Sequence, residues 1–251
     1  MLEGFKGNKK VVMLTAYGYQ MAKLLEAAGV DLLLVGDSLG MVVLGYPSTK
    51  QVTMEEMLHH TRAVARGAKN TPIIADMPIG SYDDPQLALK NARRFMEAGA
   101  VGMKVEGRVE EVIRALIFES IPVMGHMGLL PQTADRHALV GRNSDDAERI
   151  FRDAMAIDKL GVFSMVLECI PEQLAKRITE NVSSVTIGIG AGKYCDGQVL
   201  VVNDLLGMDE SFKPKYVKTY ANLSETIKKA VMGFKREVES GDFPDDTHSF
   251  H

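Results

Sequence analysis

The chain has 251 residues, of which 46% are hydrophobic and 25% charged, a composition typical of one soluble globular domain with a sizeable core. The formal net charge of −4 gives no indication of nucleic acid or an anionic membrane as a partner. No apolar run approaches the roughly 20 residues needed to cross a bilayer, and the first residues lack a signal peptide's apolar core. Cys169 and Cys195 form neither a disulfide framework nor a metal motif, which favours a reducing cytoplasm.

Short apolar runs recur along the chain, and an amphipathic stretch follows nearly every one. Their apolar character is nearly continuous, which is typical of parallel strands covered on both faces. Eight such runs alternating with helices predict an α/β fold, a single TIM (β/α)8 barrel over residues 1–251, with a doubly wound sheet as the alternative. The predicted strands are Val11–Ala16, Asp31–Val35, Ile73–Asp76, Val101–Val105, Pro122–Gly125, Ser164–Leu167, Val185–Ile189 and Val199–Val202.

The stretches between these runs carry the start and stop signals of helices. Thr53 precedes Glu56 by three residues, the spacing of a capping box, and Pro85 follows Asp84 as a first helical residue. Gly29 marks the end of the first amphipathic stretch. The predicted helices are Tyr19–Ala28, Thr53–Arg66, Pro85–Ala98, Glu110–Glu119, Asp145–Leu160 and Pro171–Glu180.

Acidic residues stand at the ends of four predicted strands: Asp37, Asp76, Glu106 and Glu168. In a parallel barrel these ends meet on one face, where the active sites of such barrels lie. Four carboxylates converging there would repel one another without protons or a cation, and a hard divalent ion such as Mg²⁺ binds carboxylate, water and substrate oxygens. One such acid alone could be an exposed loop residue or a helix cap, but four at equivalent positions favour a metal site.

Three further residues near these strand ends have two interpretations each. Lys104 lies two residues before Glu106, so both face one side of the strand, and the lysine could hold a substrate carboxylate or form a structural ion pair with Glu106. His126 fits substrate binding and an interior, hydrogen-bonded histidine equally well. Cys169 is expected to point away from the barrel mouth because it neighbours Glu168, and a nucleophilic role is disfavoured.

A glycine cluster, Gly188, Gly190 and Gly192, follows the seventh predicted strand. In barrels this position often forms an anion site made of backbone N–H groups. A tight turn between strand and loop is the alternative, and the pattern alone does not separate the two.

Ordered motifs over nearly the whole chain resemble the ketopantoate hydroxymethyltransferase family. The motifs are Thr15–Tyr17, Leu32–Tyr46, His59–Ala68, Ile73–Tyr82, Lys104–Gly107, Gly125–Gln132, Leu167–Thr179, Ile187–Asp204 and the final Glu239–His251. The resemblance implies a barrel of the phosphoenolpyruvate/pyruvate-type superfamily that transfers a hydroxymethyl group from 5,10-methylenetetrahydrofolate to 3-methyl-2-oxobutanoate. The product would be 2-dehydropantoate, formed through a metal-stabilised enolate, on the route to pantothenate and coenzyme A.

The resemblance also implies residue roles and an assembly. Asp37 and Asp76 resemble the metal ligands, and Glu106 resembles a third metal-site carboxylate that acts through water. The keto-acid contacts would be Asp37, Ser38, Asp76 and Lys104, and Glu168 would be the general base. The family further implies one Mg²⁺ per subunit and a homo-oligomer, a decamer built as a pentamer of dimers.

Two departures from the family pattern keep other functions open. Gly18 stands where many members have Asp, and residues 133–142 lack a Gly-Gly-Tyr stretch that many members carry over the barrel mouth. The alternatives are a metal-dependent keto-acid aldolase or lyase, and a non-catalytic barrel that acts as a scaffold.

Overall fold

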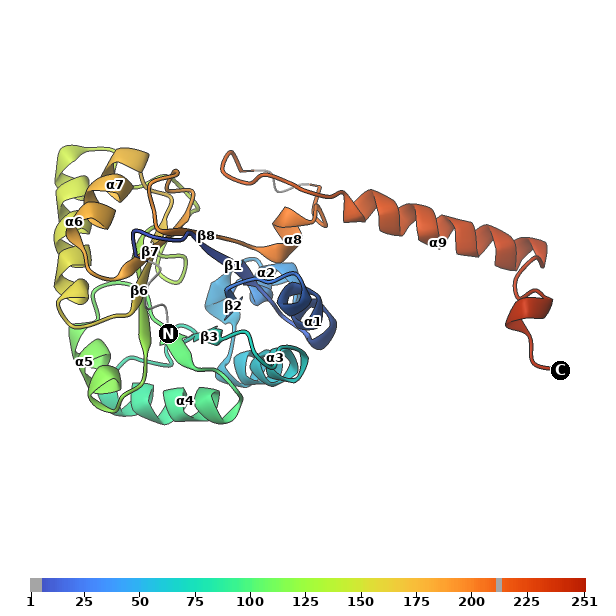
Figure 1. Ribbon diagram of the computed structural model, residues 1–251, viewed down its shortest axis with the longest axis horizontal. Helices are drawn as coiled ribbons and strands as arrows, with labels where there is room; N and C mark the ends of the chain where they lie inside the picture. The colour runs from blue at the N-terminus through green and yellow to red at the C-terminus, as the bar shows by residue number, and fades with distance from the viewer. Residues whose placement is uncertain (1–5, 211–213) are drawn as a thin grey trace. The chain divides into compact units, whose positions relative to one another are not determined.

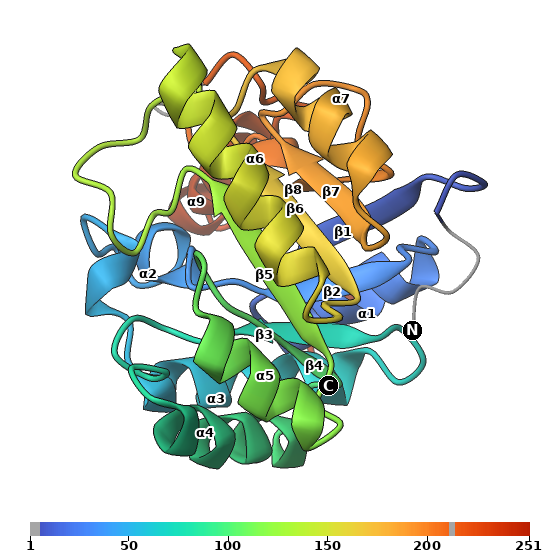
Figure 2. The ribbon, with the colours of Figure 1, turned by 90° about the vertical axis from the view of Figure 1, so that its left-hand side faces the viewer.

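The computed structural model describes residues 6–210 and 214–251. Contacts within the chain divide it into two compact units, Met1–Val201 and Val202–His251. The strands that the structure describes all belong to the first unit (Figures 1 and 2). The single domain expected over residues 1–251 stays a prediction.

The strands of the first unit form a closed barrel in chain order, with every neighbouring pair parallel. The barrel closes where β8 pairs with β1, from Val11↔Gly197 to Leu14↔Leu200. Closure confirms the (β/α)8 prediction over the doubly wound sheet, which would leave two edges. The strands are β1 (Val11–Thr15), β2 (Leu32–Val35), β3 (Ile73–Asp76), β4 (Gly102–Lys104), β5 (Val123–Gly128), β6 (Ser164–Glu168), β7 (Val185–Ile189) and β8 (Gly197–Leu200).

Helices connect the successive strands from β1 to β7 and lie outside them, as Figure 2 shows, whereas residues 190–196 join β7 to β8 without a helix. Their apolar stripes pack inward; Leu58 and Val64 of α3 and Phe95 of α4, for example, are fully buried. No helix in the described residues is long and apolar enough to cross a membrane. The helices of this unit are α1 (Tyr19–Ala27), α2 (Leu39–Val42), α3 (Met54–Gly67), α4 (Pro85–Glu97), α5 (Glu110–Phe118), α6 (Ser144–Asp158) and α7 (Glu172–Asn181), with the 3-10 turn η1 (Thr49–Gln51).

All six predicted helices are present, with ends within two residues of the prediction. The capping box is confirmed, because the Glu56 amide donates to Thr53 Oγ1 and the Thr53 amide donates to Glu56 Oε2. Two strands differ from the prediction by more than one residue at an end. β5 extends to Gly128 because it pairs with β6 as far as Glu168, and β8 begins at Gly197 because it pairs there with β1 and β7.

The barrel interior is filled by branched apolar side chains and methionines at every second strand position. This alternation is the expected result of the two-residue period of a strand. The interior cluster consists of Val11, Met13, Leu32, Leu34, Ile74, Met124, Val166, Val185, Ile187 and Val199.

The second unit contains α8 (Val202–Leu205), α9 (Leu223–Ser240) and the 3-10 turn η2 (Asp246–His248), none of which was predicted from the sequence. Asn222 caps α9 by accepting from the Glu225 amide, and Gly241 ends it in the left-handed conformation, with φ of 79°. Within the described residues, α9 buries none of its side chains. Its exposed apolar residues include Ile227, Val231, Met232, Phe234 and Val238.

The closure of the barrel gives a stability prediction at Gly197. A Cβ atom at Gly197 would lie 2.6 Å from both the Cβ and the carbonyl oxygen of Val11, so β8 would have to move away from β1. We expect Gly197→Ala to destabilise the barrel by about 1–3 kcal/mol, measured by chemical denaturation. Gly18→Ser is the control, because Gly18 has no atom within 4 Å of such a Cβ and is an N-cap, where serine is favoured. Equal unfolding midpoints for the two variants would contradict the prediction.

Candidate functional site

The polar residues predicted from the sequence gather at the carboxyl ends of the strands. Asp76, His126 and Glu168 each come two residues after a member of the interior cluster, and so face the same side of their strands. The others stand at the ends of β2 and β4 or directly beyond them. One end of the barrel therefore carries all the predicted site residues, namely Asp37, Ser38, Asp76, Lys104, Glu106 and Glu168.

Asp76 and Lys104 form a buried ion pair between neighbouring strands. Lys104 Nζ lies 2.6 Å from Asp76 Oδ1, and both side chains are at most 5% exposed. The other oxygen of Asp76 accepts a hydrogen bond of 3.1 Å from the amide of Asp37. Lys104 thus forms its ion pair with Asp76, and not with Glu106 as in the structural alternative drawn from the sequence.

His126 lies between two carboxylates. Its Nδ1 is 3.3 Å from Glu106 Oε1 and its Nε2 is 3.2 Å from Glu168 Oε2, within ion-pair distance, although the ring is not oriented for directed hydrogen bonds. Burial and the charge of Lys104 lower the pKa of His126, but the two carboxylates outweigh them and raise it to about 9. The imidazole is therefore a cation at neutral pH, and it lies between the carboxylates of Glu168 and Glu106.

Gln132 is a residue of the site to which the sequence assigned no role. Its side-chain amide donates to Asp37 Oδ2 and to the carbonyl of Met77, each at 2.9 Å, and its backbone amide donates to Glu106 Oε2. The hydroxyl of Tyr82 donates to the Gln132 side-chain oxygen. Gln132 therefore orients two of the predicted metal-site carboxylates. Its position at the end of the Gly125–Gln132 motif was the signal available in the sequence.

Ser38 lies next to this set of carboxylates. Its hydroxyl is 2.8 Å from the hydroxyl of Tyr17. A Cβ at Gly36 would meet Ser38 Oγ at 2.8 Å and Asp76 Oδ2 at 3.4 Å. The serine hydroxyl and the Asp76 carboxylate thus approach the same side of Gly36, which must remain without a side chain for both to do so.

The buried carboxylates fit a divalent cation. Burial, together with the charges of Asp76 and Glu106, raises the pKa of Asp37 to about 8, although Lys104 and the hydrogen bond from Gln132 lower it. Burial alone lowers the pKa of Lys104, but Asp76, Glu106 and Asp37 raise it above its usual value. Once Asp37 ionises, the three buried acids outnumber the two cations Lys104 and His126, and a divalent cation would neutralise the excess negative charge. All the donors are oxygens, as Mg²⁺ prefers.

This arrangement predicts that Mg²⁺ stabilises the protein more at high pH. A carboxyl whose pKa is raised by folding costs stability as the pH rises from its unfolded value, about 3.9, to its folded value. For Asp37 that cost is complete above about pH 8, and a cation bound to the ionised carboxylate removes it. We expect the rise in Tm on adding Mg²⁺ to be larger at about pH 8.5 than at about pH 6. Asp37→Asn should remove this difference, and equal Tm shifts at both pH values in the unsubstituted protein would contradict the assignment.

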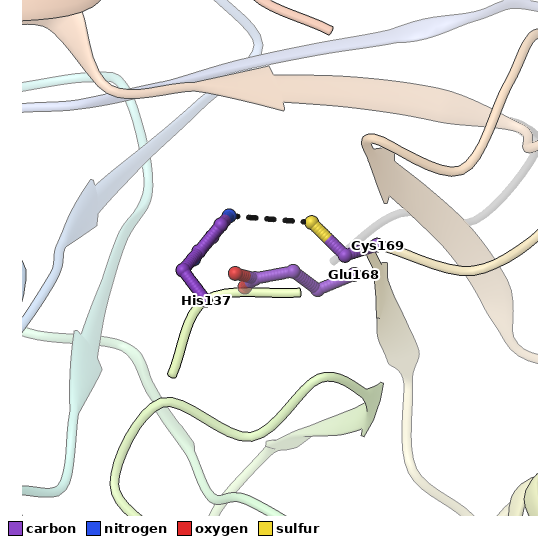
Figure 3. Close-up of side chains that lie close together, drawn as sticks. All are labelled: His137, Glu168 and Cys169. Carbon is purple, nitrogen blue, oxygen red and sulfur yellow. Dashed lines mark hydrogen bonds between the residues drawn. The ribbon is translucent and has the colours of Figure 1, made fainter. Parts of the chain in front are cut away.

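Cys169 does not point away from the site, so this expectation was wrong. It follows the last residue of β6 and has a left-handed φ of 47°, which reverses the strand alternation. Its Sγ lies 3.4 Å from Nε2 of His137, and Glu168 points into the same space (Figure 3). Among the described residues, His137, Glu168 and Cys169 form a group whose potential ligand atoms all lie within 4.8 Å of one another. The carboxylate oxygens of Asp37, Asp76 and Glu106 do not form a group that meets this distance criterion.

The glycine-rich segment after β7 forms a tight turn. Gly190 and Gly192 have positive φ values of 64° and 75°, and the Gly192 carbonyl accepts from the side chain of Gln198. A Cβ at Gly192 would lie 2.3 Å from the Cβ of Glu172. These contacts account for the glycines by backbone conformation and close packing, and the anion site stays a prediction.

Comparison with known proteins finds close relatives over nearly the full chain. The family model described as ketopantoate hydroxymethyltransferase matches residues 2–246. A protein of Syntrophus aciditrophicus named 3-methyl-2-oxobutanoate hydroxymethyltransferase is 53% identical, over 98% of this chain and 93% of its own length. A protein of the same name from Clostridium botulinum is 50% identical, over 97% of this chain and 91% of its own.

Solved structures with low sequence identity share the fold. The 2,3-dimethylmalate lyase of the PEP mutase/isocitrate lyase superfamily superposes with a TM-score of 0.63 at 15% identity, over 99% of this chain and 89% of that one. Phosphoenolpyruvate phosphomutase from Streptomyces platensis superposes with a TM-score of 0.64 at 16% identity, over 94% and 85% of the two chains. These likenesses confirm the barrel class.

Proposed function

This chain belongs to the ketopantoate hydroxymethyltransferase family, and from that premise we propose that it transfers a hydroxymethyl group from 5,10-methylenetetrahydrofolate to 3-methyl-2-oxobutanoate, giving 2-dehydropantoate. The observation that carries the proposal is the buried set of Asp37, Asp76, Lys104 and Glu106 at the barrel mouth, joined through His126 to Glu168. Such a set matches a reaction that removes a proton next to a carbonyl while negative charge builds up on oxygen.

Asp37, Asp76 and Glu106 would hold one Mg²⁺, with Glu106 acting through water. When bound, the ion supplies Lewis acidity toward the carbonyl oxygen of the keto acid. Asp37 and Asp76 would also be keto-acid contacts. Two observations support this assignment. The donors are oxygens, which Mg²⁺ prefers, and the raised pKa of Asp37 favours replacement of its proton by a cation.

The other residues would bind the keto acid and move its proton. Lys104 would hold the keto-acid carboxylate, and the Ser38 hydroxyl, beside Asp76, would donate to a substrate oxygen. Glu168 would remove the proton from C3, and the resulting carbon would attack the methylene group of the folate as one of its two carbon–nitrogen bonds breaks. Water would then replace the second nitrogen, giving the hydroxymethyl group and tetrahydrofolate. His126, 3.2 Å from Glu168, would orient the carboxylate toward that proton. Holding the keto acid and the folate in the reactive orientation would supply much of the remaining rate acceleration.

The direct test is an assay of the purified protein with Mg²⁺, 3-methyl-2-oxobutanoate and methylenetetrahydrofolate. We expect 2-dehydropantoate, detected by mass spectrometry. A folded, metal-loaded protein that forms no product would contradict the proposal. Faster turnover with a free aldehyde than with the folate would favour the keto-acid aldolase instead.

A homo-oligomer, expected as a decamer built from a pentamer of dimers, also belongs to the proposal. Apolar side chains on α9, including Val231, Met232 and Phe234, support it because they are exposed in one chain. Sedimentation should give a mass ten times that of one chain, and a monomer would contradict the assembly. A cytoplasmic location is expected as well, because Cys169 and Cys195 are both free thiols.

A further inference from the structure

A second group of potential metal ligands lies at the end of β6. A ring nitrogen of His137, a carboxylate oxygen of Glu168 and the Sγ of Cys169 all lie within 4.8 Å of one another (Figure 3). We propose that these three side chains bind a thiophilic divalent cation of the zinc class, at a site separate from the Mg²⁺ ligands, and that this cation inhibits the enzyme by occupying Glu168.

The types of donor atom distinguish this site from the proposed Mg²⁺ site of Asp37, Asp76 and Glu106. Imidazole and thiolate donors favour zinc over magnesium, whereas all the donors of the first set are carboxylate oxygens. In a tetrahedral zinc site, Zn–S and Zn–N bonds of about 2.3 and 2.0 Å place the two ligand atoms about 3.5 Å apart. Cys169 Sγ and His137 Nε2 are 3.4 Å apart. Three protein ligands would leave a fourth position for water.

Backbone hydrogen bonds hold the loop that carries His137 against the end of β6. Before the loop, the Leu129 amide donates to the Glu168 carbonyl, and after it the Val140 amide donates to the Cys169 carbonyl, both at 2.9 Å. Both ends of the loop are therefore tied to the two residues that supply the other ligands. The left-handed φ of Cys169 turns its thiol toward His137. The ligands are thus held together before a cation binds, which lowers the cost of ordering them.

Cation binding at this site would prevent Glu168 from acting as the proposed base. A carboxylate oxygen of Glu168 that ligates the cation cannot accept a proton from the keto acid, so this consequence rests on the proposed function. A cysteine binds zinc as the thiolate, so the cation must displace the proton from the sulfur of Cys169.

Cobalt(II), added to the full chain in excess Mg²⁺, is the probe of the site. Sulfur ligation should give a thiolate-to-cobalt charge-transfer absorption that Cys169→Ser abolishes and Cys195→Ser retains, because Cys195 is also a buried free thiol. His137→Gln should weaken cobalt binding by at least about 10–100-fold, and His59→Gln, which alters another exposed histidine, should not. Circular dichroism establishes that each variant is folded, and His137→Gln still tests the site if Cys169→Ser is not folded.

Absence of the absorption in the unsubstituted chain, or its survival in Cys169→Ser, would overturn the site. The absorption is read without substrates, so a chain that shows it but makes no 2-dehydropantoate would retain the site and contradict the proposed function. A chain that forms 2-dehydropantoate but lacks the absorption would support the proposed function and contradict the site. With both present, Zn²⁺ added in excess Mg²⁺ should lower activity in a manner reversed by a chelator. The remaining fraction of activity should be larger in Cys169→Ser than in Cys195→Ser, and equal fractions would overturn the inhibitory role.

Discussion

Glu168→Gln is expected to lower kcat by about 10²–10⁴-fold, the contribution of a well-placed general base. Glutamine keeps the shape of the side chain, and His126 remains 3.2 Å from the position of its terminal atom. The amide, however, cannot take up the C3 proton of the keto acid. Because the proposed Mg²⁺ ligands are other residues, Mg²⁺ binding and the KM for the keto acid should change little.

Proton exchange isolates this step from the folate reaction. In heavy water with Mg²⁺ and no folate, the unsubstituted enzyme should exchange the C3 hydrogen of 3-methyl-2-oxobutanoate for deuterium, seen by NMR, and Glu168→Gln should not. Glu172→Gln, an exposed glutamate at the start of α7, is the matched control and should exchange normally. Normal exchange in Glu168→Gln would remove Glu168 from the role of base.

Asp76→Asn is expected to lower kcat/KM by about 10³-fold or more, because it removes a ligand of a Lewis acid worth several kcal/mol. The substitution also breaks the buried ion pair with Lys104, whose Nζ lies 2.6 Å from Asp76 Oδ1. The lysine would then lie in the interior without that carboxylate. Mg²⁺ affinity, measured by calorimetry, should fall together with activity, and stability should fall as well.

Substitution of a second buried acid, Asp196, distinguishes the loss of Mg²⁺ binding from the loss of stability. Asp196 pairs with Lys6 Nζ at 2.8 Å, directly before the start of β8 at the other end of the barrel strands. Asp196→Asn should therefore cost stability as Asp76→Asn does, but leave Mg²⁺ affinity unchanged. Retained Mg²⁺ affinity in Asp76→Asn would show that Asp76 is not a metal ligand.

The strand ends were predictable because local patterns carry that information. A nearly continuous apolar run predicts a buried parallel strand, and the residue that ends it must lie at the mouth of a parallel barrel. Asp76 and Glu168 follow this logic directly, since each is the last residue of its strand. The position of β5 was less predictable, because its extension to Gly128 depends on pairing with β6, a segment about forty residues later.

The sequence by itself determined the barrel class, six helices and which acidic residues reach the mouth, because strand and helix periods are local properties. Only the tertiary structure decided what those residues touch. Gln132 reaches Asp37 from 95 positions away, and Lys104 pairs across strands with Asp76, because closure and register set such distances. Cys169 faces His137 because one left-handed backbone angle, held by long-range hydrogen bonds, overrides the alternation that the sequence predicted.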